Sequence, residues 1–238
     1  MLMSPQNLPE RINAVLEQVT RAAVAAGRSA HSVTLLAVGK AQPPQMLAAA
    51  ARCGLQHFGE SYLQEALQKI AALQELPLTW HFIGQVQTNK TRAIAENFAW
   101  VHALDRPKIA QRLSAQRPFH APPLNVCLQV NLGAQSTKGG VAGAGLAALA
   151  AAVAALPRLK LRGLMCIPPE EADPARQRAW FAQLRALQDE LNASGLGLDT
   201  LSMGMSADFQ AAIAEGSTIV RLGTALFGPR PPTPDLRR

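Results

Sequence analysis

VTLLAVGKAQPPQMLAAAARCGLQHFGE, residues 33–60, contains the repeating unit from which the fold follows. An apolar run at 33–38 is followed by a segment with helical periodicity at 44–53 and by a second short apolar segment at 55–59. A strand that is apolar along its whole length is typical of a parallel sheet whose two faces are both covered by helices. The stretch therefore predicts a strand–helix–strand unit with parallel strands.

The same alternation continues along the whole chain. Eight strands are predicted, at 33–38, 55–59, 80–84, 99–104, 125–131, 161–167, 199–203 and 218–222. Helices are predicted between them, at 44–53, 60–74, 88–97, 106–116, 142–156, 174–194 and 206–215, and a further helix at 8–26 precedes the first strand. Eight such units favour an α/β fold closed into a (β/α)8 TIM barrel with an extra N-terminal helix. The alternative is an open, doubly wound sheet.

Length and composition indicate one domain in a reducing compartment. A chain of 238 residues with 48% hydrophobic content can bury one sizeable core, so we expect a single domain over residues 1–238, with a mobile tail at 229–238. Three widely separated cysteines, Cys53, Cys127 and Cys166, lie in apolar segments and indicate reduced thiols. The sequence contains neither a signal-peptide pattern nor an apolar run of about 20 residues, so we expect a cytoplasmic protein without membrane association.

The basic charge balance is compatible with either nucleic acid or a phosphorylated small molecule. The formal net charge is +7, but the basic residues are spread along the chain and aromatic residues make up only 5% of it. Stacking surfaces interleaved with positive charge are hard to build from that composition, so nucleic acid is the weaker interpretation. We also expect no metal, because no histidine has a cysteine or carboxylate partner at metal-ligand spacing.

Lysine is much rarer than arginine in this chain. It occurs at positions 40, 69, 90, 108, 138 and 160, and the other basic residues are arginines. Only an amine can lose its proton near neutral pH and attack a carbonyl group. Lys40 directly follows the first strand, whereas Lys69 and Lys108 are expected on helix surfaces. Lys40 is therefore either a covalent attachment site or a strand-end residue that extends to solvent.

The last two predicted strands carry a possible phosphate site. In a (β/α)8 barrel the loops that follow the strands form the active site, and phosphate commonly binds after strands seven and eight. Ser206 is expected at the N-cap of the helix at 206–215, where it could cap the helix, bind phosphate, or do both. In RLGTALFG, Arg221, Gly223 and Thr224 add a cation, a close backbone approach and a hydroxyl. These phosphate signals favour the covalent interpretation of Lys40.

Six motifs together resemble a known family. They are LLAVGK, QHFGESYLQE, WHFIGQVQTNK, QVNLGAQSTKGG, LRGLM and LSMGMSADFQAAIAEGSTIVRLGTALFG, and they occur in order over about residues 8–228. This combination resembles the YggS/PROSC family of pyridoxal-phosphate homeostasis proteins. The resemblance implies the barrel of the alanine racemase N-terminal domain, with pyridoxal 5'-phosphate (PLP) held as a Schiff base on Lys40.

The same resemblance assigns roles to other positions. It implies that Arg221 faces the pyridine nitrogen, that Ser206, Gly223 and Thr224 surround the phosphate, and that Asn89 and Lys90 line the mouth. Further implied or candidate contacts are with Met203, which could instead pack the barrel, with His81 and, at a second PLP site, with Lys138 or Lys90. Four positions depart from the family pattern: Gly39 stands where many relatives have serine, Gln42 where many bacterial relatives have a second lysine, Ser61 where asparagine is usual, and Gln135 where a glutamate commonly precedes the lysine of the KxG motif.

The expected function is storage, buffering or delivery of PLP in vitamin B6 homeostasis, without robust catalysis. An arginine opposite the pyridine nitrogen disfavours its protonation and weakens the ring as an electron sink. The chain also has a single tyrosine, Tyr62. A monomer that binds PLP and passes it to PLP-dependent apo-enzymes is expected. The alternatives are a fold-type III PLP enzyme such as an amino-acid racemase and, on charge alone, a nucleic-acid binder. His57, His81 and His102 are expected to be packed, hydrogen-bonded histidines.

Overall fold

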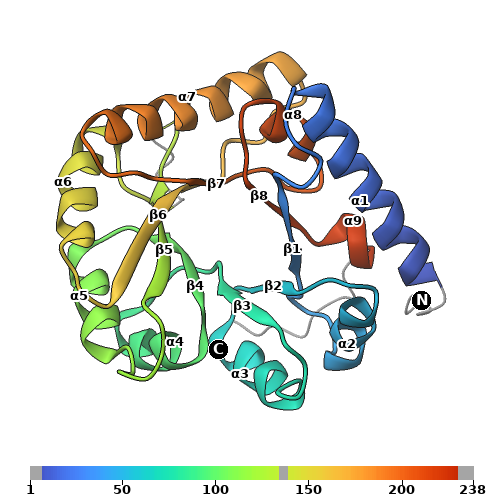
Figure 1. Cartoon of the computed structure of the whole chain (residues 1–238), viewed down its shortest axis with the longest axis horizontal. Coiled ribbons are helices and arrows are strands. Elements are labelled where there is room, and N and C mark those ends of the chain that lie inside the picture. Colours follow the sequence, from blue (N-terminus) through green and yellow to red (C-terminus); the bar gives the residue numbers. More distant parts are fainter. Residues whose placement is uncertain (1–6, 134–138, 230–238) are drawn as a thin grey trace.

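A closed barrel of eight parallel strands forms the centre of the protein, as Figure 1 shows for the computed structural model. The structure describes residues 7–133 and 139–229. The strands are β1 (Thr34–Val38), β2 (His57–Glu60), β3 (Thr79–Phe82), β4 (Trp100–Leu104), β5 (Leu124–Val130), β6 (Leu159–Cys166), β7 (Thr200–Ser202) and β8 (Ile219–Leu222). They follow one another round the barrel, and β8 pairs with β1. The (β/α)8 prediction is confirmed, because an open sheet would leave β1 and β8 as unpaired edges.

Helices surround the barrel (Figure 1). They are α1 (Leu8–Ala25), α2 (Pro44–Arg52), α3 (Leu63–Ala72), the 3-10 helix η2 (Thr88–Lys90), α4 (Thr91–Asn97), α5 (Pro107–Gln116), α6 (Gly143–Ala154), α7 (Pro174–Ala193), α8 (Phe209–Ala214) and α9 (Thr224–Phe227). Three predictions differ from this. The helix predicted from residue 60 begins at Leu63, the one predicted from 206 begins at Phe209, and α9 was not predicted.

The extra N-terminal helix fills the gap in the ring between α8 and α2. Its buried residues recur every three or four positions, which gives α1 one apolar face; they are Leu8, Ile12, Val15, Val19 and Ala23. That face packs against α8, α9 and α2 (Figure 1). Arg28, just beyond the helix, donates to the backbone oxygens of Ile213 and Ser217 at 3.1 and 2.8 Å. The first helix is therefore anchored to the last strand–helix unit of the barrel.

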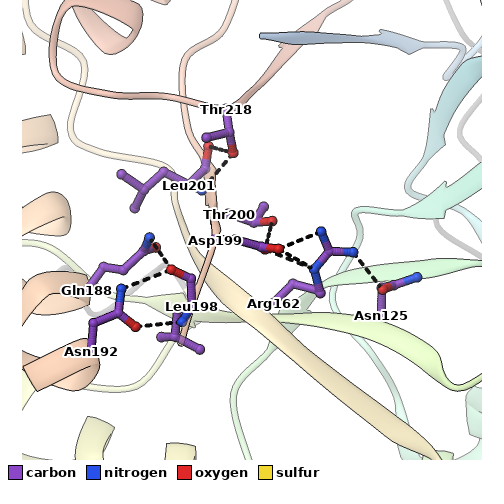
Figure 2. A network of polar contacts seen from close by, with 9 residues as sticks. All are labelled: Asn125, Arg162, Gln188, Asn192, Leu198, Asp199, Thr200, Leu201 and Thr218. Carbon is purple, nitrogen blue, oxygen red and sulfur yellow. Dashed lines mark hydrogen bonds and ion pairs between the residues drawn. The ribbon is translucent and has the colours of Figure 1, made fainter. Parts of the chain in front are cut away.

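A polar network ties the start of β7 to its neighbours, as Figure 2 shows. Arg162 of β6 donates to both carboxylate oxygens of Asp199 and to Asn125 Oδ1 of β5, over 2.8 to 3.1 Å. On the other side, Asn192 of α7 accepts from the backbone nitrogen of Leu198 and donates to its oxygen. Asp199 immediately precedes β7, so this network lies at the N-terminal end of the strands. It therefore stabilises the end of the barrel opposite the loops that follow the strands.

One close strand contact requires glycine. At Gly163 of β6, a β-carbon would lie 1.8 Å from the backbone oxygen of Thr200 in β7. Because that oxygen belongs to the neighbouring backbone and cannot rotate away, only glycine permits the pairing of these strands.

Two sets of residues lie outside the part of the chain that the structure describes. Residues 230–238 make up nearly all of the predicted tail, and residues 134–138 include Lys138. Among residues 7–133 and 139–229, no helix is both long and apolar enough to span a bilayer.

Candidate functional site

Lys40 lies in the turn directly after β1. The strand ends at Val38, and the lysine side chain is partly buried two residues later. Its Nζ atom lies 5.7 Å from the centroid of the Tyr62 ring, which follows β2 and is 44% exposed. The next residue, Ala41, has a φ of 62°, in the left-handed region that residues with a β-carbon rarely adopt. Among the described residues, Ala41 is the only non-glycine residue with a positive φ, and it lies directly beside Lys40.

The loops after β7 and β8 meet each other next to this turn. The Ser206 hydroxyl accepts a hydrogen bond from the backbone nitrogen of Ala225 at 3.2 Å, which joins the two loops. Gly223 begins the second loop, and a β-carbon there would lie 3.4 Å from Val38 Cβ at the end of β1. Ser206, Gly223 and the exposed Thr224 are therefore brought together, close to the strand that leads into Lys40.

The expected capping role of Ser206 is wrong. Helix α8 begins at Phe209, and Asp208 occupies its N-cap position. The Asp208 carboxylate accepts from the backbone nitrogen of Met205 at 2.6 Å, which closes a turn before the helix starts. Because that turn uses residues 205–208, the Ser206 hydroxyl is directed to the neighbouring loop instead.

Arg221 is buried within the barrel and anchored by neighbouring strands. Its Nη1 donates to the backbone oxygen and the hydroxyl of Ser202 at 2.6 and 2.8 Å, and its Nη2 donates to the backbone oxygen of Cys166 at 2.9 Å. Burial lowers the pKa of the guanidinium from its usual value. Met203, the residue after Ser202, is fully buried in the main hydrophobic core, and its contact with a cofactor stays a prediction.

Three histidines continue from Ser202 across the barrel interior. His102 Nδ1 lies 2.7 Å from the Ser202 hydroxyl, His81 Nδ1 lies 2.9 Å from His102 Nε2, and His57 Nδ1 lies 3.0 Å from His81 Nε2. Burial lowers the pKa of all three rings, to about 3 for His102, where the charge of Arg221 adds to the effect. The prediction of packed, hydrogen-bonded histidines is confirmed. Both ring nitrogens of His81 are engaged by histidines, and its contact with a cofactor stays a prediction.

Other predicted residues lie on the loop after β3 or beyond the described structure. Asn89 and Lys90 belong to η2, where Asn89 is exposed and Lys90 partly buried. Their place at the mouth and their contact with a cofactor stay predictions. Lys138 lies outside the described residues.

One cluster of charged side chains was missed. Lys69, predicted on a helix surface, is only 2% exposed, and that prediction is wrong. Its Nζ lies 2.7 Å from Glu60 Oε1 and 2.6 Å from Glu65 Oε1, and it donates to the backbone oxygen of Gly39 at 2.7 Å. The i, i+4 spacing of Glu65 and Lys69 was a visible signal of an ion pair. That the pair faces the barrel depends on how α3 packs against β2.

The chemistry of these groups fits an aldehyde that carries a phosphate. Lys40 supplies a primary amine, which is the nucleophile that carbonyl compounds need. The hydroxyls of Ser206 and Thr224, together with the close backbone approach at Gly223, supply the polar and compact surroundings that suit an anion. Arg221 adds a permanent positive charge on β8, the strand that pairs with β1.

Comparisons with known proteins agree with this chemistry. The family model described as the alanine racemase N-terminal domain matches residues 15–231. A pyridoxal phosphate homeostasis protein of Pseudomonas aeruginosa is 58% identical over 223 residues, covering 94% of this chain and 96% of the relative. The protein of that name from Escherichia coli is 49% identical over 219 residues, covering 91% and 94%.

Solved structures show the same relationship. PipY of Synechococcus elongatus, solved with PLP bound, matches with a TM-score of 0.83 and 38% identity, covering 93% of this chain and all of that one. The fold alone is shared with the D-threonine aldolase of Filomicrobium marinum, at 18% identity and a TM-score of 0.72. The chain therefore belongs to the alanine racemase N-terminal domain family and, within it, to the YggS/PROSC group of pyridoxal phosphate homeostasis proteins.

Proposed function

We propose that this protein binds PLP through Lys40 and serves in PLP homeostasis as a carrier or buffer of the cofactor. The observation that carries the proposal is the position of the Lys40 turn beside the joined loops of Ser206 and Gly223. PLP carries an aldehyde and a phosphate dianion. The aldehyde condenses with a primary amine, with loss of one water. The PLP-bound PipY relative supports the choice of ligand.

The residues of the site divide the binding between them. Lys40 is the covalent attachment point, and Ser206, Gly223 and Thr224 hold the phosphate. Arg221 keeps a permanent positive charge near the ring, and since a cation repels a further proton, the pyridine nitrogen stays unprotonated. A ring in that state is a weaker electron sink, which suits a carrier better than a catalyst. Asn89 and His81 are assigned to the surroundings of the cofactor, and Lys90 or Lys138 to a second contact.

Borohydride reduction tests the attachment point. The full chain is mixed with PLP, reduced, digested and mapped by mass spectrometry, and an absorbance spectrum is recorded before reduction. We expect the reduced adduct on Lys40 in the wild type and in Lys108→Ala, because Lys108 is exposed on α5, and its absence in Lys40→Ala. An undiminished adduct in Lys40→Ala would refute the proposal.

A second candidate function is an amino-acid racemase or a related PLP enzyme. The observation that favours it is the Tyr62 ring beside Lys40, because a phenol can donate or accept a proton. If the protein is such an enzyme, the α-carbon of alanine or another amino acid exchanges its hydrogen for solvent deuterium in the presence of PLP, and Tyr62→Phe slows the exchange. Lack of exchange with a panel of amino acids excludes this candidate.

We also propose that the chain acts as one domain and as a monomer in the cytosol, and that it passes PLP to apo forms of PLP-dependent enzymes. The buried free thiols of Cys127 and Cys166 support a reducing compartment. A transfer assay checks the delivery step: protein loaded with PLP is mixed with an apo-enzyme, and recovery of that enzyme's activity is followed in the presence of a phosphatase that destroys free PLP. Recovery no faster than from free PLP contradicts delivery.

A further inference from the structure

Two charged side chains of α3 hold the backbone on both sides of Lys40. Lys69 Nζ donates to the backbone oxygen of Gly39 at 2.7 Å, and the backbone nitrogen of Ala41 donates to Glu65 Oε1 at 2.7 Å. Ala41 has a φ of 62°, and such a conformation persists in an alanine only where surrounding contacts enforce it. The contacts of Lys69 and Glu65 therefore fix the turn from which the Lys40 side chain extends.

Glu60 completes this group, which we call the buried ion cluster (Glu60, Glu65 and Lys69). Glu60 is the last residue of β2 and is fully buried, and its Oε1 lies 2.7 Å from Lys69 Nζ. Its other oxygen, Oε2, has no hydrogen-bond partner among the described residues. A carboxylate has room for about four hydrogen bonds, and a buried oxygen without any is costly. Packing alone does not account for a carboxyl group at this place.

The charges of the cluster make Lys40 its natural counterpart. The charged groups that act on Glu60 are Lys69 and Glu65 of α3 and Lys40 after β1. Two carboxylates and one ammonium leave one negative charge in excess, which a protonated Lys40 balances. When Glu60 is itself protonated, the excess disappears, and the neutral amine of Lys40 is no longer disfavoured.

Burial brings the protonation of Glu60 into the neutral pH range. Desolvation raises the pKa of Glu60 to about 7, while the positive charges of Lys69 and Lys40 act in the opposite direction. Gly39 permits the arrangement, because a β-carbon at that position would lie 2.5 Å from Glu60 Oε1. A larger residue at 39, such as the serine of many relatives, would push the carboxyl group away from its present place.

We propose that the buried ion cluster positions Lys40 and that the charge on Glu60 sets the pH at which the Lys40 nitrogen becomes a free amine able to bond to an aldehyde. Glu60, Glu65 and Lys69 are positioning residues, since they act through Lys40. This inference rests on the proposed function, because it takes Lys40 as the attachment point for PLP.

The test is the pH profile of PLP loading in Glu60→Gln. The full chain is mixed with PLP across the neutral range, reduced with borohydride, and the modified fraction of Lys40 is measured by mass spectrometry. Without the carboxylate, the ammonium form of Lys40 is less stabilised, so we expect the midpoint of loading to move to lower pH by about half a unit or more. Glu96→Gln is the matched control, because it removes a carboxylate from the exposed ion pair with Arg92, and it should follow the wild-type curve.

The outcomes separate this inference from the proposed function. If the wild type carries the label on Lys40 and Glu60→Gln has the wild-type midpoint, the cluster does not tune Lys40, and the proposed function stands. If the wild type carries no label on Lys40, the proposed function fails, and this inference with it.

A second variant covers the case in which Glu60→Gln does not fold. Glu65→Gln removes the other carboxylate charge at a side chain that is 17% exposed, and its amide oxygen can still accept from Ala41. It should move the midpoint in the same direction by a smaller amount. Glu60→Asp keeps the charge and should return the midpoint toward that of the wild type. If Glu60→Gln does not fold, an unmoved midpoint in Glu65→Gln overturns the inference.

Discussion

Lys69 Nζ lies 2.7 Å from Glu60 Oε1, in an ion pair whose side chains are almost completely buried. Removing two charges from water is costly, and the attraction between them recovers that cost only when the remaining polar atoms are also satisfied. Glu60 Oε2 is not satisfied within the described part of the chain. Such a pair adds little net stability, which agrees with the positioning role inferred for it above.

The first prediction concerns the pH dependence of stability. Since the pKa of Glu60 rises from 4.5 to about 7 on folding, the native state binds one more proton than the unfolded chain between these values. The free energy of unfolding should therefore fall as pH rises through this window, by up to about 3 kcal/mol from this group. Urea unfolding at a series of pH values should show that Glu60→Gln lacks this component. A constant difference between wild type and variant at all pH values would contradict it.

The second prediction concerns His102, for which the sign is opposite. Burial and the charge of Arg221 lower its pKa from 6.5 to about 3, so the unfolded chain binds a proton that the native state does not. Stability should therefore fall as pH drops from about 6.5 to about 3, by up to about 5 kcal/mol from this residue. His102→Gln should show a shallower loss of stability in acid. His120→Gln, at an exposed position, is the control and should keep the wild-type slope.

The third prediction concerns the contact between Ser202 and its neighbours. Ser202→Ala removes a hydrogen bond from Arg221 and the partner of His102 Nδ1, and leaves both groups buried. An unsatisfied buried group costs about 1–3 kcal/mol, so the urea midpoint should fall accordingly. Ser194→Ala, at an exposed position after α7, should change the free energy of unfolding by less than about 0.5 kcal/mol. Equal effects of the two substitutions would show that the buried contact contributes nothing.

The fourth prediction compares two glycines. Gly163→Ala places a methyl group 1.8 Å from the Thr200 backbone oxygen, so strands β6 and β7 must separate, and the variant should lose more than about 3 kcal/mol of stability or fail to fold. Gly143 is the first residue of α6, and the methyl group added by Gly143→Ala would have no atom within 4 Å. Its stability should stay within about 1 kcal/mol of the wild type. Thermal unfolding monitored by circular dichroism measures both, and a stable Gly163→Ala would contradict the tight strand contact.

The fifth prediction concerns thiol reactivity. Burial raises the pKa of Cys127 to about 12, and Cys166 is also buried, whereas Cys53 is partly exposed. Because the thiolate is the reactive form, a short treatment of the folded protein with iodoacetamide should label Cys53 first. Peptide mapping checks this, with denatured protein as the control in which all three cysteines react. Labelling of Cys127 as fast as Cys53 in the folded protein would show that the barrel interior opens readily.

Much of the architecture could be predicted from the sequence. The strand predictions at 33–38 and 218–222 agree with β1 and β8 to within one residue at each end, because apolar runs between helical patterns report locally on burial. The place of Lys40 after β1 followed in the same way. Chain order along a parallel sheet also predicted that the loops after β7 and β8 lie near each other.

Contacts across the barrel were decided only by the tertiary structure. The chain of hydrogen bonds from His57 to Arg221 joins residues of β2, β3, β4, β7 and β8, which are adjacent only once the barrel has closed. Periodicity placed Lys69 on a helix but could not reveal that Glu60 and the Gly39 oxygen lie within its reach. Local pattern reports whether a position is apolar, whereas the partner of a polar side chain depends on which distant segments packing brings beside it. For that reason the sequence determined the barrel and the position of its amine, and only the folded structure decided which charges surround that amine.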